Sequence, residues 1–163
     1  MALDHDEKPS QPLAKFESML KTDDIYFFDA EDFEDIIHFY LNHGKIALAK
    51  KAIKIGLLQH PDSIELKLLN VEVLVFENKL EIAERMLDDL EFLDASNEEI
   101  YIQRANIYSK KDNHEAAVAL LNKALDLTDD GFDIHSLLGM EYLFMDNYEL
   151  AKDNFIKCVD FDP

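Results

Sequence analysis

The sequence predicts an all-α protein built from repeated helical hairpins, and three observations support this. Glycine and proline number only 4 each among 163 residues, so few tight turns can form. Apolar residues recur at helical spacing and not in the alternation typical of strands. One pattern also returns every 34 residues, as shown by Ala49, Ala83, Ala117 and Ala151. A period of this length is typical of solenoids, in which stacked hairpins form one continuous core.

The first 29 residues precede the repeats and predict a polar tail followed by a short helix. Pro12 suits the first turn of a helix that carries Leu13, Phe16, Met19 and Leu20 on one face. Because the end of a solenoid needs a cap, we expect this helix to cover the first hairpin. A detachable ligand segment is the alternative.

Residues 30–163 divide into four units, 30–63, 64–97, 98–131 and 132–163. Each contains two apolar stretches joined by a short polar segment, which predicts helix-turn-helix. Ser96 with Glu99, and Asp62 with Glu65, have the spacing of capping boxes at the starts of first helices. The recurrent alanine marks the place where the two helices of a hairpin approach most closely.

The last unit is not followed by a helix that could cover Leu150, Phe155 and Val159. We therefore expect some apolar surface to be bare at this end. Either the natural protein continues with further repeats, or this end stacks on another copy of the chain.

Charge and composition restrict the partners. The 35 acidic and 16 basic residues give a net charge of -19, which repels nucleic-acid phosphates and anionic lipid surfaces. No apolar run reaches the roughly 18 residues of a membrane span, and the polar start does not resemble a secretory signal. With one cysteine, the chain is expected in the cytoplasm.

The sequence contains no phosphate-binding glycine loop, no nucleophile elbow and no zinc-protease motif. Its 6 histidines are not spaced as metal ligands. We therefore expect neither an enzyme nor a metal or cofactor site.

The repeats resemble tetratricopeptide repeats over residues 30–163. The fourth unit carries most of the family pattern, with Leu138-Gly139, Tyr142, Ala151, Phe155, Cys158 and Pro163. The general composition of the sequence is similar to that of tetratricopeptide proteins from Bacteroidetes bacteria. The resemblance implies a superhelix that binds a partner protein or an extended peptide in a concave groove made by the first helices.

The resemblance also implies which residues line that groove. They stand at the second, fifth and ninth places of each unit: Glu31, Glu34, His38; Glu65, Leu68, Glu72; Glu99, Ile102, Asn106; and Asp133, Ser136, Met140. The twelfth places add Leu41, Val75, Ser109 and Leu143. The second place is acidic in every unit, which favours an acidic ligand surface or, equally, simple compensation of the helix dipole.

Chaperone-binding members of the family hold a terminal carboxylate with basic residues, whereas Glu34, Glu65 and Glu72 would repel one. A segment with Lys or Arg and an apolar anchor suits this groove better. The expected function is thus a non-enzymatic interaction module. The alternatives are a structural segment that associates end to end, and a docking domain of a larger protein.

Overall fold

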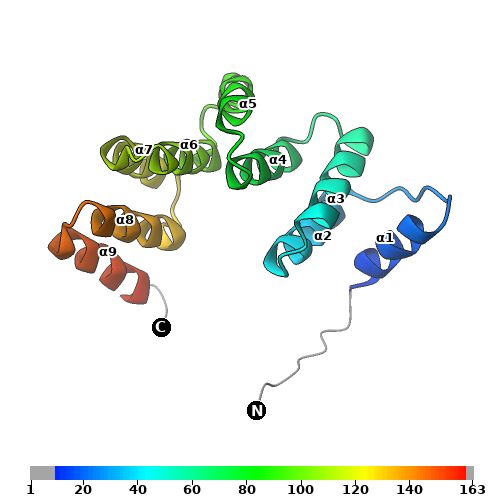
Figure 1. Ribbon diagram of the computed structural model, residues 1–163, viewed down its shortest axis with the longest axis horizontal. Helices are drawn as coiled ribbons and strands as arrows, with labels where there is room; N and C mark the ends of the chain where they lie inside the picture. The colour runs from blue at the N-terminus through cyan, green and yellow to red at the C-terminus, as the bar shows by residue number, and fades with distance from the viewer. Residues whose placement is uncertain (1–9, 161–163) are drawn as a thin grey trace, which may run out of the picture. The chain divides into compact units, whose positions relative to one another are not determined.

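The computed structural model describes residues 10–160, and all its regular elements in that range are α-helices (Figure 1). In chain order they are α1 (Gln11–Lys21), α2 (Ala30–Asn42), α3 (Ile46–Gln59), α4 (Ile64–Phe76), α5 (Leu80–Leu93), α6 (Glu98–Lys110), α7 (His114–Leu127), α8 (Phe132–Phe144) and α9 (Tyr148–Asp160). The predicted class, an all-α helix-turn-helix repeat solenoid with a short N-terminal capping helix, is confirmed.

The chain forms two compact units that divide between Asn70 and Val71, within α4. Unit 1 contains α1, α2, α3 and the first half of α4. Unit 2 contains the second half of α4 and the helices α5 to α9.

In unit 1, α1 covers the first hairpin through an aromatic core. Ser10 caps the helix, since its Oγ accepts a hydrogen bond from Leu13 N at 3.4 Å. The fully buried ring of Phe16 lies 6.2 Å from the ring of Phe28, 6.4 Å from that of Phe33 and 6.2 Å from that of Tyr40. These edge-to-face and tilted contacts are favourable for aromatic pairs. The predicted amphipathic face of α1 is therefore packed against the hairpin.

The segment between α1 and α2 is attached to the end of α3. Gln59 donates from Nε2 to Tyr26 O at 2.8 Å, and its Oε1 accepts from Phe28 N at 3.0 Å. The Nε2 of His60 lies 2.6 Å from Phe28 O. These contacts satisfy backbone groups that no helix or strand pairs.

In unit 2, α6 and α7 form one hairpin, α8 and α9 form the next, and α7 packs on α8 (Figure 1). Buried residues of α6, α7 and α8 make one apolar cluster: Tyr101, Ala105, Ala117, Leu121, Ala124, Ile134 and Leu138. Arg104 on α6 also reaches α5, where its Nη2 lies 2.8 Å from both Asp88 Oδ1 and Glu91 Oε2.

The recurrent alanines occupy matching places in the second helices of the hairpins. Ala49, Ala83 and Ala117 are fully buried, and Ala151 is 1% exposed. This burial confirms that the 34-residue period marks close packing.

The turns inside the hairpins share one backbone conformation. Gly44, Asn78, Asp112 and Asp146 follow one another at intervals of 34 residues and have φ of 68°, 61°, 58° and 56°. This left-handed region is open to glycine and tolerated by asparagine and aspartate, which explains the residue types found there. The polar joints expected from the sequence are therefore turns.

The expected capping boxes are wrong by one residue. Asn97, not Ser96, caps α6, because its Oδ1 accepts from Glu99 N at 3.1 Å. A turn from Asp94 O to Asn97 N at 3.3 Å precedes the helix, and Ser96 Oγ donates to Asp94 Oδ1 at 3.2 Å. Likewise Ser63, not Asp62, accepts from a first-turn amide of α4, that of Leu66, at 3.2 Å.

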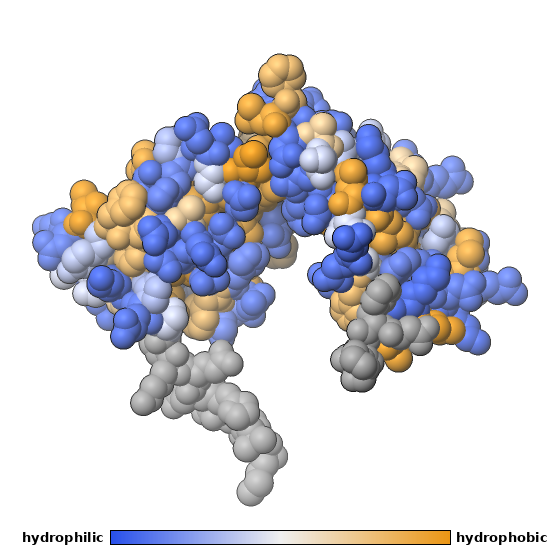
Figure 2. Space-filling view, turned by 180° about the vertical axis from the view of Figure 1, so that it is seen from behind, coloured by the Kyte–Doolittle hydropathy of each residue, from blue (hydrophilic) through white to orange (hydrophobic). Residues whose placement is uncertain are grey.

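Apolar side chains reach the surface among hydrophilic ones on the face in Figure 2. On α8 and α9 of unit 2, Leu150 is 40% exposed and Val159 is 71% exposed, as expected, whereas Phe155 is half-buried. Phe155 and Val159 line an open depression of about 370 Å³ together with Leu143, Tyr148 and Ile156.

Candidate peptide-binding surface

In unit 1, predicted groove residues gather around Glu34. Glu31, Glu34 and His38 lie on one side of α2 because they are three and four residues apart. Burial raises the pKa of Glu34 above its ordinary value, and the nearby charge of Glu65 on α4 raises it further, while His38 lowers it. The carboxylates of two successive first helices therefore act on one another.

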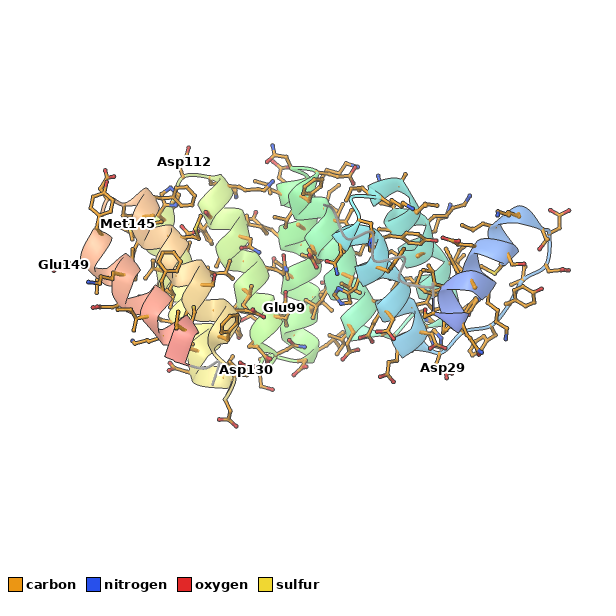
Figure 3. All side chains as sticks on the ribbon, turned by 90° about the horizontal axis from the view of Figure 1, so that it is seen from below. Asp29, Glu99, Asp112, Asp130, Met145 and Glu149 are labelled. Atoms are coloured by element: carbon orange, nitrogen blue, oxygen red, sulfur yellow. The ribbon has the colours of Figure 1, made fainter. Side chains whose placement is uncertain are left out.

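In unit 2, a second group gathers around Glu99 on α6 (labelled in Figure 3). Burial is the largest cause that raises the pKa of Glu99, and the hydrogen bond from Gln103 opposes it. The charges of Glu72, Glu98 and Asp133 raise the pKa further. Carboxylates of the first helices α4 and α8 thus lie close enough to act on Glu99 of α6.

The predicted residues differ in how much surface they offer. Glu31, His38, Glu65, Glu72, Asp133 and Met140 are exposed, while Glu34, Glu99, Ile102, Asn106 and Ser136 are half-buried. Leu68 is only 6% exposed and Val75, at a twelfth place, only 4%, so these two predicted residues offer a partner almost no surface. Their helix is apolar on several sides, so the place in the repeat alone did not reveal their burial.

The prediction missed Gln103, a polar residue that is 4% exposed. Its Nε2 donates to Glu99 Oε1 at 2.7 Å. Gln103 occupies the sixth place of its repeat, where the second and fourth repeats have Leu69 and Leu137. The first repeat has the exposed Asp35 at this place, so a polar residue where two of the other three repeats have leucine was only a weak signal.

The predicted groove residues include no lysine or arginine, and Asn106 is their one amide. Within residues 10–160, no three His, Cys, Asp or Glu side chains are grouped as a metal ion would require. Over the same part of the chain, no helix is both long and apolar enough to cross a membrane. The chemistry available at this surface is therefore attraction of positive charge combined with burial of apolar groups such as Met140.

The raised pKa of Glu99 predicts that protonation of this one carboxyl contributes to the stability of unit 2. Because the folded chain holds this proton to higher pH than the unfolded chain, its contribution to the free energy of unfolding rises as pH falls from 7 through the raised pKa. Glu99→Gln should therefore raise the melting temperature at pH 7, with a difference from the unaltered chain that shrinks toward pH 4. Thermal melts monitored by circular dichroism over this range measure it.

Asp89→Asn is the matched control, because Asp89 is exposed on α5. It should change the melting temperature little at any pH. A Glu99→Gln variant that melts below the unaltered chain at pH 7 would contradict the expectation.

The family model described as tetratricopeptide repeat matches residues 98–130 and 132–163, which contain the α6–α7 and α8–α9 hairpins. No curated protein matches the chain.

Solved structures share the fold at low sequence identity. A thermophilic tetratricopeptide repeat protein of Thermus thermophilus is 24% identical with a TM-score of 0.74, over 93% of this chain and 81% of that one. A tetratricopeptide repeat protein of Parabacteroides merdae is 16% identical with a TM-score of 0.76, over 93% of this chain and 58% of that one. MamA of Desulfovibrio magneticus is 19% identical with a TM-score of 0.58, over 81% and 75% of the two chains.

Stacked helical hairpins of this kind define a helical-repeat solenoid. Residues 98–130 and 132–163 match the tetratricopeptide repeat family model directly, and the chain shares its fold with solved tetratricopeptide repeat proteins. The fold is in general a protein–protein interaction module, and its members are generally non-enzymatic scaffolds.

Proposed function

We propose that the chain binds a protein segment that carries lysine or arginine together with an apolar anchor, along the first helices of four repeats at 30–63, 64–97, 98–131 and 132–163. The observation that carries the proposal is that burial raises the pKa of Glu34 and of Glu99 and carboxylates of neighbouring first helices raise it further, Glu65 for Glu34 and Glu72 with Asp133 for Glu99. Capping alone explains an acid at each helix start, but it does not explain Glu34 or Glu72, which lie beyond the first turn.

The expected partner is a protein rather than a nucleic acid or a membrane. A net charge of -19 repels the phosphates of a nucleic acid and the headgroups of anionic lipids. The proposal places the chain in the cytoplasm as a non-enzymatic adaptor. Charge complementarity should act mainly on the rate of association, and apolar contacts at residues such as Met140 on the lifetime of the complex.

A charge-reversal variant tests this function. Segments captured by the chain from a display library of random peptides should be rich in Lys, Arg and large apolar residues. The triple variant Glu34→Lys, Glu65→Lys, Glu72→Lys should associate with them about 10-fold more slowly, and salt should slow association with the unaltered chain. Surface plasmon resonance at several salt concentrations measures both effects.

The matched control reverses three exposed carboxylates outside this surface, Glu81, Glu115 and Glu149. It changes the net charge equally and should leave association within about 2-fold of the unaltered chain. Equal loss in both triple variants, or association that is insensitive to salt, would refute a defined acidic site.

The exposed apolar face of α8 and α9 favours a second candidate, self-association through that face. Light scattering distinguishes self-association from peptide binding at the acidic surface. A mass that rises with concentration and is unaffected by the charge reversals supports self-association. A constant monomer mass refutes it.

A further inference from the structure

Gln103 is a buried polar residue at a place where two other repeats have leucine and the first repeat has the exposed Asp35. Leu69 and Leu137 fill the same place in the second and fourth repeats, and Leu69 is buried like Gln103. A leucine here would need no hydrogen bonds. An amide at this place must find partners for its donor and its acceptor.

The amide of Gln103 finds only part of what it needs. Its Nε2 donates to Glu99 Oε1 at 2.7 Å, which fixes the amide beside that carboxylate. Its Oε1 is buried and has no hydrogen-bond partner among the described residues. A buried acceptor without a donor is costly, so a donor from outside the chain would be bound favourably at this place.

The charges around the amide restrict what that donor can be. The neighbours whose charges act on Glu99 are the carboxylates Glu72, Glu98 and Asp133, from α4, α6 and α8. They favour a positively charged donor. A metal ion is not favoured, because no group of three acidic, histidine or cysteine ligands is assembled within the described residues.

We propose that Glu99 and Gln103 form a subsite for one arginine side chain of the bound segment. The inference rests on the proposed function and specifies its central contact. The planar guanidinium group has five N–H donors, so it can donate to the carboxylate of Glu99 and to Oε1 of Gln103 at once. An ammonium group is a compact, strongly hydrated charge and matches two such acceptors less well.

The carboxylate is the half-exposed part of the subsite and the amide oxygen is the buried part. The guanidinium therefore meets Glu99 first. Rotation about the last side-chain bond of Gln103, a soft torsion, then turns Oε1 to the second N–H, and the hydrogen bond from Nε2 to Glu99 is exchanged for the one that the guanidinium donates to that carboxylate. Binding at this subsite should thus change the environment of the Gln103 amide directly.

Small probes test the subsite without any partner protein. N-acetyl-arginine methylamide, and the citrulline and lysine compounds of the same form, are titrated into the full ¹⁵N-labelled chain while the Gln103 side-chain amide signal is followed by NMR. The arginine probe should shift this signal and bind at least about 10-fold more tightly than the uncharged citrulline probe, with lysine in between. Equal binding of arginine and citrulline would overturn the proposal.

Gln103→Leu should fold at least as well as the unaltered chain, since leucine stands at this place in two other repeats, and should weaken the arginine probe about 5-fold or more. Gln103→Met is a second apolar variant should the first fold poorly. Glu115→Gln, at an exposed carboxylate of unit 2 outside this surface, is the control and should change binding less than 2-fold. Arginine binding that survives both Gln103 substitutions would refute the subsite.

The two proposals can fail separately. Captured basic segments whose affinity is unchanged by Gln103→Leu would overturn the subsite and leave the proposed function in place. Arginine-probe binding that depends on Gln103, together with a failure to capture any segment, would support the subsite and refute the proposed function.

Discussion

Replacing Phe16 with alanine should destabilise the chain by about 3–5 kcal/mol, the largest effect we expect from a single substitution. The side chain is fully buried and its ring contacts those of Phe28, Phe33 and Tyr40. Removing it leaves a cavity between α1 and the first hairpin. Urea unfolding measures the loss, and faster proteolysis within residues 22–29 should accompany it because α1 is then held less firmly.

Phe27→Ala removes the same group from a side chain that is 71% exposed. It should cost less than about 1 kcal/mol, because little apolar area returns to water. If the two alanine variants unfold at similar urea concentrations, α1 does not stabilise unit 1 as its packing indicates.

Ala117→Leu should lower the free energy of unfolding by about 1–3 kcal/mol through overpacking. Ala117 is fully buried in the cluster that joins α6, α7 and α8, where a larger side chain must push two helices apart. For a chain of this length each kcal/mol lowers the melting temperature by about 2–4 °C. A thermal melt monitored by circular dichroism measures the shift.

Ala119→Leu is the control in the same helix, since Ala119 is exposed. Its effect should stay within about 0.5 kcal/mol. An unchanged melt for Ala117→Leu would show that the period of 34 residues does not mark close packing.

The fold could be predicted because its signal is repeated and helical. One buried alanine in each hairpin and one left-handed residue in each turn recur at the same interval. The pattern in each repeat therefore strengthens the prediction of a helical hairpin in the next. The helix caps could not be placed to the residue. Ser96 and Asn97 are both good caps, and the turn that ends α5 decides between them through its hydrogen bond to Asn97 N.

The candidate site could be predicted only in outline. The places in the repeat indicated a row of carboxylates, and the pKa of Glu34 and of Glu99 is raised by neighbouring carboxylates of that row. The burial of Leu68 and the role of Gln103 depend on which side of a helix faces a neighbour, and local spacing does not give this. In α4, where apolar residues surround the helix, that side was hardest to predict.

The shared conformation of Gly44, Asn78, Asp112 and Asp146 has an evolutionary consequence. Every hairpin turns through one residue with a similar positive φ. A gene duplication that copies one whole unit therefore also copies a working turn for the added hairpin. Such arrays can change length by whole modules, while gain or loss of a single residue at a bend would disturb the hairpin that contains it.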